Sequence, residues 1–383
     1  MSTSSISRAN RGRVLAELVY SLGVSRAELA ARTGLSVATV SRAVAALDAA
    51  GLVTQGAEER TLGRPITLVR LADRAAGTLV MDVADHHTAI AAISLSGTLL
   101  WQETIPVDPE VRGAARLDHS LEMVDRGVAC WPEGTRMLGI GVSVPGPVDE
   151  DGTVDFAPAV DWKRVRLGPL IHERTGVPVS VQNDANLIAV AESEFGRARE
   201  RRALFALAVF DGIGSGIVVD GTLLEGADGA SGQIGRMLFT PDSIQNVYPG
   251  FGDMESRLGT PAVRERAAAA GVEIDPSADV WREVLVDRPR LDPVAKEFAS
   301  DVLDEFAYAL TNVCALVNPD TVVLAGYFAP IADHVGPELH RRLTGRVLHV
   351  PEFIAESTTI RGTLLGAALG AQRAYGPLEQ LLD

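Results

Sequence analysis

One stretch near the N-terminus, SRAELAARTGLSVATVSRAVAALDAAGLVTQ at residues 25–55, constrains the fold more than any other part of the chain. Ser25 can cap a helix, and Glu28 three residues later completes the pattern of a capping box. Gly34 supplies the left-handed backbone conformation that ends a helix, and Ser36 can cap the next one. The stretch therefore predicts two short helices joined by a tight turn.

The second helix of this pair has one apolar side and one side of small and polar residues. Val40, Val44 and Leu47 follow spacings of four and three, which place them on one stripe of a helix. The opposite side carries short side chains and one guanidinium group, as in a helix that enters the major groove of DNA. The residues that we expect to face DNA are Ser36, Ala38, Thr39, Ser41 and Arg42.

A β-wing is predicted to follow the two helices. Residues 52–55 and 67–71 are β-type runs separated by GAEERTLGRPI. Arg64 in this connection is expected to reach a phosphate or a narrow minor groove. We therefore predict that residues 1–72 form a winged helix-turn-helix domain that binds double-stranded operator DNA. A small helical bundle that binds protein is the alternative.

The charge of the chain is distributed unevenly. Residues 1–72 carry nine arginines and five acidic residues, a local charge of +4. The formal net charge of the chain is −15, so the remaining residues carry −19. A basic module joined to an acidic body indicates that only the first part binds a polyanion.

Hydropathy and cysteine content exclude several protein classes. No apolar run approaches the roughly 18 residues that a membrane span needs, and the polar N-terminus is followed by no apolar stretch. We therefore expect a cytoplasmic protein without a membrane partner. Cys130 and Cys314 are the only cysteines and lie far apart, which excludes a disulfide framework and a cysteine metal cluster.

From Gly77 onward, β-type runs alternate with helical patterns in two cycles. Each cycle opens with consecutive strands, which predicts an α/β region of two lobes with an actin-like, sugar-kinase-like fold and a ligand between the lobes. The predicted segments are residues 78–84, 88–95, 97–107, 114–129 and 136–146, then 203–210, 214–226, 294–317 and 321–326. The predicted lobes are residues 77–185, completed by a C-terminal helix at 363–383, and residues 186–360.

Four motifs carry a resemblance to a known family. They are GIGVSVPGPVDEDG at 139–152, QNDANLIAVAESEFG at 182–196, GIGSGIVVDGTLLEG at 212–226 and GASGQIGR at 229–236. With the predicted DNA-binding domain, the chain resembles the ROK family of repressors and sugar kinases over nearly its whole length. It resembles the transcriptional branch, which includes xylose- and N-acetylglucosamine-type repressors, because the kinase branch lacks a DNA-binding module.

The loops that hold ATP phosphates in the family's kinases are altered in this chain. The resemblance places a glycine-rich loop at residues 82–87, where Ala84 fills a glycine position and Asp85 adds a carboxylate. Asp211 adds a second carboxylate in the other phosphate loop, and Ala325-Gly326-Tyr327 replaces three glycines on the adenosine side. Unpaired like charges in a partly desolvated cleft oppose phosphate binding. We therefore expect no cofactor, no catalytic residue and no kinase activity.

The sugar-binding positions of the family are only partly kept. Asn183, Asp184 and Glu255 match the family's residues, whereas Gln233 replaces a glutamate and Arg236 a zinc-binding histidine. The residues that we expect to contact an effector are Gly146, Asn183, Asp184, Gln233, Arg236 and Glu255. Capping of the next helix is the alternative role for Asp184.

No zinc site is expected. The segment at 241–255, where the family has three cysteines, contains none, and zinc needs soft or imidazole ligands. Arg236 has two possible roles. It can bind an acidic or phosphorylated sugar, or it can pair with Glu255 or Asp184 and hold a loop that lacks its metal. We favour the structural pairing.

These observations predict a homodimeric or homotetrameric DNA-binding regulator, a repressor of carbohydrate-related genes, whose effector is a sugar or an acidic sugar derivative. One alternative is a ROK-type sugar kinase with a fused DNA-binding module. Another is a regulator with a vestigial cleft that acts without a small ligand.

Overall fold

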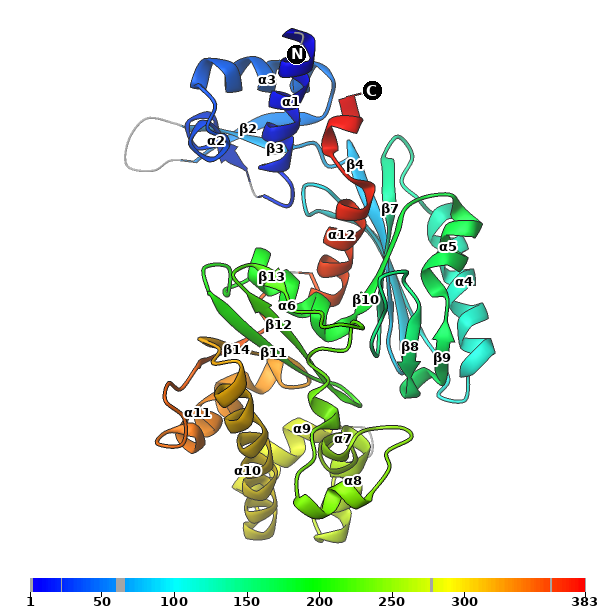
Figure 1. Ribbon diagram of the computed structural model, residues 1–383, viewed down its shortest axis with the longest axis vertical. Coiled ribbons are helices and arrows are strands. Elements are labelled where there is room, and N and C mark those ends of the chain that lie inside the picture. Colours follow the sequence, from blue (N-terminus) through cyan, green and yellow to red (C-terminus); the bar gives the residue numbers. More distant parts are fainter. Residues whose placement is uncertain (1–2, 22, 60–65, 276–277, 359, 383) are drawn as a thin grey trace.

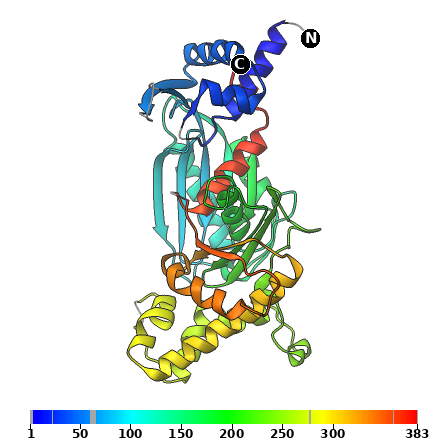
Figure 2. The ribbon, with the colours of Figure 1, turned by 90° about the vertical axis from the view of Figure 1, so that its left-hand side faces the viewer.

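The computed structural model describes residues 3–21, 23–59, 66–275, 278–358 and 360–382. The molecule is elongated, with a small N-terminal domain and both termini at one end (Figure 1). Two five-stranded sheets follow along the long axis, and the helix α10 (Pro293–Leu316) lies at the opposite end. A view turned by 90° shows the same order of domains along the long axis, with the C-terminus beside the N-terminal helix (Figure 2).

The N-terminal domain is a winged helix-turn-helix domain, as predicted. Three helices pack beside a small sheet in which β3 lies between β1 and β2. Its elements are α1 (Thr3–Ala16), β1 (Val24–Ser25), α2 (Arg26–Thr33), α3 (Val37–Ala49), β2 (Val53–Glu59) and β3 (Ile66–Leu71). Val40, Val44 and Leu47 are completely buried in its core, which confirms the predicted inner face of the second helix.

The turn between α2 and α3 forms as the sequence predicts. Gly34 has a φ of 70°, and the Ser25 and Ser36 side chains accept hydrogen bonds from the backbone N–H groups of Glu28 and Thr39. Only half of the predicted capping box forms, because the Glu28 carboxylate binds Arg32 one turn later instead of returning to the cap.

The first large sheet has the strand order β10-β7-β4-β5-β6. Its strands are β4 (Ala76–Val83), β5 (His87–Ser94), β6 (Leu99–Pro106), β7 (Arg136–Val144) and β10 (Val179–Asn183). The helices α4 (Gly113–Ala129) and α5 (Leu167–Thr175) cover one face, and the hairpin of β8 (Val154–Ala157) and β9 (Trp162–Val165) lies beside the sheet. β4 and β5 are buried along almost their whole length, as a sheet covered on both faces requires.

The second large sheet repeats this topology, with the strand order β13-β12-β11-β14-β15. Its strands are β11 (Ala203–Val209), β12 (Ile213–Val219), β13 (Thr222–Leu223), β14 (Thr321–Gly326) and β15 (Glu352–Ala355). The helices beyond it are α7 (Asp253–Leu258), α8 (Thr260–Ala269), α9 (Val280–Arg282), α10 and α11 (Ala332–Leu343). In both sheets an antiparallel meander pairs with two later parallel strands, which confirms the predicted actin-like, two-lobed architecture.

Two helices lie between the sheets and pack on each other. They are α6 (Asp184–Glu194), which contacts β11 and β12, and α12 (Gly362–Tyr375), which contacts β4, β7 and β10. Cβ at Gly141 of β7 would lie 2.0 Å from the Ala367 carbonyl oxygen, so glycine permits the close approach of α12. The predicted lobe boundary at residue 185 falls in the first turn of α6, which packs mainly on the second sheet.

The C-terminal segment differs from the predicted single helix at 363–383. α12 ends at Tyr375, Gly376 turns the chain at a φ of 94°, and Leu378–Leu382 forms a 3₁₀ turn. Leu378 and Leu381 lie in the hydrophobic cluster that joins the core of the winged helix-turn-helix domain to Ala76, Leu95 and Leu138 of the first lobe. Among the described residues, no helix is both long and apolar enough to cross a membrane.

Candidate DNA-facing helix and effector cleft

The start of α3 presents a solvent-exposed surface. Ser36, Ala38 and Arg42 are exposed, Thr39 and Ser41 are partly exposed, and the Arg42 guanidinium lies 3.5 Å from the Thr39 hydroxyl. Val37 on the same turn is half-exposed, so this apolar side chain lies at the surface and not in the core. Sequence reasoning missed Val37, whose methyl groups suit contact with a thymine methyl. Arg64 lies outside the described residues.

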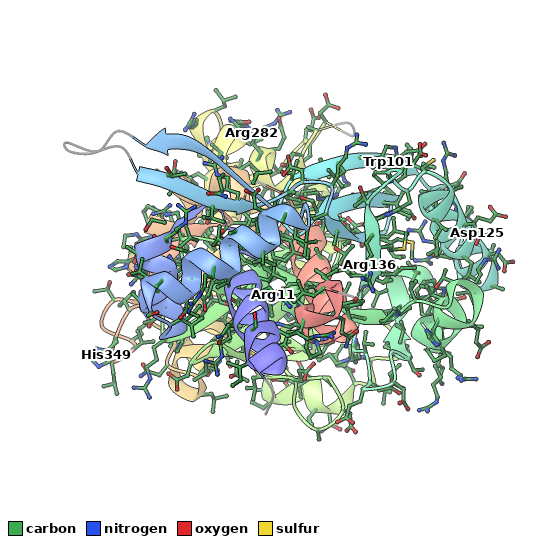
Figure 3. All side chains as sticks on the ribbon, turned by 90° about the horizontal axis from the view of Figure 1, so that it is seen from above. Arg11, Trp101, Asp125, Arg136, Arg282 and His349 are labelled. Carbon is green, nitrogen blue, oxygen red and sulfur yellow. The ribbon has the colours of Figure 1, made fainter. Side chains whose placement is uncertain are left out.

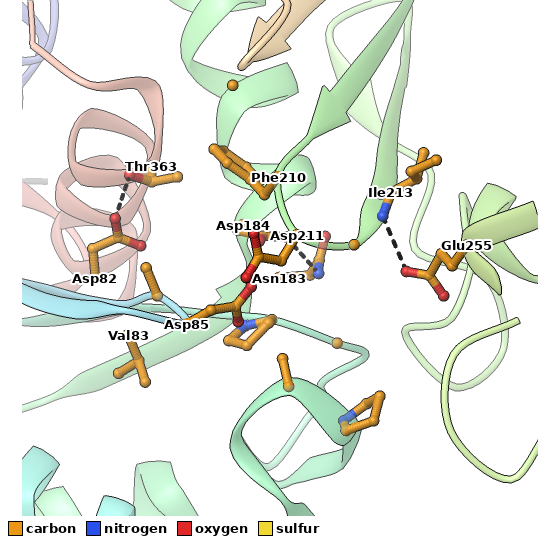
Figure 4. Close-up of a pocket in the computed structure, with 18 of the residues that line it drawn as sticks. Asp82, Val83, Asp85, Asn183, Asp184, Phe210, Asp211, Ile213, Glu255 and Thr363 are labelled. Carbon is orange, nitrogen blue, oxygen red and sulfur yellow. Dashed lines mark hydrogen bonds between the residues drawn. The ribbon is translucent and has the colours of Figure 1, made fainter. Parts of the chain in front are cut away.

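A cleft of about 420 Å³ lies between the two large sheets. It is formed where the turns after β4 and β11 face each other, with the N-terminus of α6 at its base (Figure 4). All the predicted effector residues line it: Gly146, Asn183, Asp184, Gln233, Arg236 and Glu255. Gly146 has a φ of 108°, and a Cβ there would lie 2.2 Å from the Phe156 carbonyl oxygen, so the cleft wall requires glycine at this position.

Asn183 and Asp184 hold different positions at the start of α6. The Asn183 side chain caps the helix by accepting a hydrogen bond from the Asn186 N–H, 3.2 Å away. One oxygen of Asp184, Oδ1, accepts from the Ala185 N–H at 2.7 Å and from the Asn183 amide at 2.9 Å. Asn183 is therefore the N-cap of α6, and Asp184 both accepts from an N–H group of the first turn and lines the cleft. Burial, with the charges of Asp82 and Asp85, raises the pKa of Asp184 to about 7.

Carboxylates from both lobes face each other at the two loops that resemble phosphate-binding loops. Asp85, after β4, and Asp211, after β11, point toward Asp184 (Figure 4). Burial and the Asp211 charge raise the pKa of Asp85 to about 6. His86 Nε2 lies 2.6 Å from Asp211 Oδ2, which joins the two lobes across the mouth of the cleft. The altered phosphate loops thus contact each other directly.

Residues near the C-terminus complete one wall of the cleft, and sequence reasoning missed them. Thr363 donates a hydrogen bond to Asp82 at 3.2 Å, and Arg361 lies 3.7 Å from the same carboxylate oxygen. The Arg361 guanidinium also lies 2.9 Å from His87 Nε2. His86 is exposed, whereas His87 is half-buried at the start of β5.

Arg236 holds the loop that corresponds to the family's zinc-binding segment. Its guanidinium lies 3.5 Å from the Tyr248 carbonyl and 3.3 Å from the Gly250 carbonyl, and 5.4 Å from the centre of the Phe156 ring. The predicted pairing with Glu255 or Asp184 does not form. Glu255 instead accepts hydrogen bonds from the backbone N–H groups of Ile213 and Gly252, each at 3.0 Å.

The same loop has a second polar link. Asp253 accepts hydrogen bonds from the Tyr248 hydroxyl at 2.7 Å and from the Phe239 N–H at 2.8 Å. Hydrogen bonds donated by Arg236 and accepted by Asp253 thus hold the segment at 239–253 in place. In the part of the chain that the structure describes, no three or more His, Cys, Asp or Glu side chains are grouped as metal ligands.

Comparisons with known proteins agree with this architecture. Residues 78–373 match the model of the ROK family, and residues 4–61 match that of the MarR family. A xylose repressor of Bacillus spizizenii is 29% identical over 329 residues, which are 83% of this chain and 82% of that protein. A transcriptional regulator of Mycobacterium bovis is 30% identical over 79% of this chain and 71% of its own.

Two solved structures match this chain to different extents. A ROK family transcriptional regulator, a homologue of the E. coli MLC protein, covers 98% of this chain at a TM-score of 0.76 and 24% identity. A ROK family glucokinase of Streptomyces griseus covers only 78% of this chain, although 100% of its own, at a TM-score of 0.65 and 21% identity. This chain therefore belongs to the ROK family, with a winged helix-turn-helix domain preceding its ROK domain.

Proposed function

We propose that the protein is a DNA-binding repressor of carbohydrate-related genes, that a sugar-like effector binds in the cleft, and that it transfers no phosphate. The observation that carries the proposal is the division of the cleft. The part of the cleft that would hold a sugar keeps Asn183, Asp184 and Glu255, which match the family's sugar-binding residues. The part that would hold phosphates is occupied by Asp85 and the His86–Asp211 pair. The similarity to xylose repressors supports a role in sugar regulation.

The effector acts on DNA binding through its preference for one arrangement of the lobes. A ligand can shift DNA affinity only by binding one arrangement more tightly than the other. Two copies of the chain would place two α3 helices on half-sites one helical turn apart, since operator symmetry follows protein symmetry. We therefore propose a homodimer or homotetramer that acts in the cytoplasm.

Phosphate transfer is tested directly by incubating the purified protein with ATP, Mg²⁺ and a panel of sugars. We expect no sugar-dependent ADP release, because ATP phosphates would meet carboxylates from both lobes. Sugar-dependent turnover would contradict the proposal and favour a kinase with a fused DNA-binding module. Absence of thermal stabilisation by every sugar would favour a regulator with a vestigial cleft.

Replacement of Arg42 by alanine tests the DNA-facing surface. We expect Arg42→Ala to weaken operator binding by about 1–3 kcal/mol and to relax the sequence preference, because an exposed guanidinium at this position reads base edges. Fluorescence anisotropy with operator and random DNA at fixed salt measures both effects. Arg290→Ala, an exposed arginine at the far end of the molecule, is the control. Equal losses on operator and random DNA would exclude base reading by Arg42.

A further inference from the structure

A side-chain contact joins the two loops that face each other across the cleft. His86 lies in the turn between β4 and β5 of the first lobe, and Asp211 lies in the turn between β11 and β12 of the second lobe. His86 Nε2 lies 2.6 Å from Asp211 Oδ2, and both residues line the cleft. The His86 side chain is 55% exposed and that of Asp211 is 18% exposed, so the contact lies at the boundary between the cleft and solvent. We call this pair the latch.

The Asp211 carboxylate depends on His86 for its contact. Within the described residues, no other side chain donates to this carboxylate. Arg112 and Arg116 of α4 donate to backbone carbonyls of the first lobe, and Arg361 lies beside Asp82. Nε2 of a histidine can donate a hydrogen bond whether the imidazole is charged or neutral. The bond that holds Asp211 therefore crosses from one lobe to the other.

Without His86, the two facing loops would repel each other. Asp85 precedes His86 in the first lobe and points toward Asp211 of the second lobe (Figure 4). Burial and the Asp211 charge raise the pKa of Asp85, whereas the charge of His86 lowers it. Like charges on two separate bodies favour their separation, and a cation between them opposes it. The charged imidazole thus offsets the repulsion between the loops.

The two lobes also meet at the base of the cleft, where α6 packs on α12. Cβ at Gly366 of α12 would lie 2.3 Å from the Leu187 carbonyl oxygen of α6, so glycine permits the close contact between the helices. Shear motions between domains proceed through small sliding of packed helices. Arg236 of the second lobe also spans the cleft, with its guanidinium 5.4 Å from the centre of the Phe156 ring in the first lobe. The latch therefore lies across the cleft from a contact of the kind that allows sliding.

We propose that the latch holds the two lobes together in the ligand-free protein and thereby sets the arrangement on which DNA binding depends. This inference rests on the proposed effector cleft. An effector that needs separated lobes to enter the cleft must first break the contact between His86 and Asp211. Its apparent affinity is then its intrinsic affinity multiplied by the fraction of molecules in which the latch is open.

Double electron–electron resonance spectroscopy measures the arrangement of the lobes in the full-length protein without any ligand. Spin labels are attached at two exposed positions, Glu110→Cys in the first lobe and Lys296→Cys in the second. The background is Cys130→Ser, and the remaining cysteine, Cys314, is buried. We expect a narrow distribution of distances when the latch is present, and a longer and broader one in the His86→Ala variant.

A second substitution separates the latch from a general loosening of the cleft. Asp211→Asn in the His86→Ala background removes the repulsion between Asp85 and Asp211, so we expect the distances to return toward those of the wild type. His349→Ala changes an exposed histidine outside the cleft lining and should leave the distances unchanged. Unchanged distances in His86→Ala, with operator binding as in the wild type, would overturn the latch and leave the proposed repressor function intact.

Operator binding shows whether the arrangement of the lobes affects the DNA-binding domain. Measured by fluorescence anisotropy without sugar, the operator affinity of His86→Ala should differ at least about fivefold from that of His349→Ala, as expected for coupling between two sites. Separated lobes with unchanged operator affinity would overturn the link to DNA binding, and with it the proposed action of the effector, although the latch itself would stand.

Discussion

In the ligand-free protein, the Asp184→Asn variant is expected to be more stable than the wild type, and its advantage is expected to grow between about pH 4 and pH 7. Asp184 is buried beside the charges of Asp82 and Asp85, which raise its pKa from 3.8 to about 7. Asparagine keeps the same Oδ1 acceptor for the Ala185 N–H and the Asn183 amide and carries no charge. The variant therefore removes an electrostatic penalty without removing a hydrogen bond.

The direction of the pH dependence follows from proton linkage. Because the folded pKa lies above the unfolded value, the folded protein binds the proton more tightly, and wild-type stability falls as pH rises from about 4 to 7. The shift from 3.8 to about 7 corresponds to roughly 4 kcal/mol at most, so we expect the variant to gain about 1–4 kcal/mol at pH 8. Below the unfolded pKa the two proteins are expected to be equally stable.

Urea unfolding of the two proteins at several pH values measures this difference. The Asp301→Asn variant, which changes an exposed aspartate on α10, is the control and should show no pH-dependent advantage. A variant that is less stable than the wild type at pH 8 would contradict the raised pKa of Asp184. A gain in stability at pH 8 would mean that the charge of Asp184 destabilises the folded wild-type protein. Residues of functional sites often carry such a cost in stability.

The sequence predicts the helix caps and the turn of the N-terminal domain well, because each depends on residues that are close together in the chain. The caps at Ser25 and Ser36 and the turn at Gly34 depend on residues within three positions of each other, and each forms as predicted. The alternation of strands and helices likewise predicts most strands of both sheets, because burial on two faces makes strands such as β4 and β11 apolar along their length. The parallel edge strands β10 and β15 were not predicted.

The cleft could be predicted only in part, because several of its contacts join distant positions. The family's motifs bring Asn183, Asp184 and Glu255 to the cleft. Thr363, however, reaches Asp82 across 281 positions of sequence, and no local pattern indicates that contact. The sequence predicts a structural role for Arg236 but names the wrong partners. Its actual partners are backbone carbonyl groups, which every residue has, so no sequence pattern indicates them.

Two helices connect the cleft with the DNA-binding domain. α6 begins at Asp184, and Phe195 at its end packs against Tyr20 of the N-terminal domain, with ring centres 5.2 Å apart. α12 begins beside the cleft residue Thr363 and leads to Leu378–Leu382, which packs on α1. Since the two helices pack on each other, the cleft and the N-terminal domain are joined by continuous packed contacts.

Arg136 fixes the end of this path. It lies beside α12 when the molecule is viewed from above (Figure 3). Its guanidinium donates to the Gln380 carbonyl at 3.2 Å and lies 5.9 Å from the centre of the Tyr375 ring. The C-terminal turn is thus bound to the first sheet by Arg136 and to the winged helix-turn-helix core by its two leucines. The DNA-binding domain therefore depends on residues at the opposite end of the chain.

The double variant Leu378→Ala/Leu381→Ala is expected to loosen the DNA-binding domain and to leave the cleft intact. Both leucines are buried in the hydrophobic cluster that contains that domain's core, and each truncation costs about 2–5 kcal/mol. Hydrogen exchange should show reduced protection of α1, and operator affinity should fall at least about tenfold. Sugar binding should stay unchanged. The control Leu316→Ala/Leu348→Ala removes two exposed leucines and should alter none of these. Unchanged protection of α1 would show that the C-terminal turn does not stabilise the DNA-binding domain.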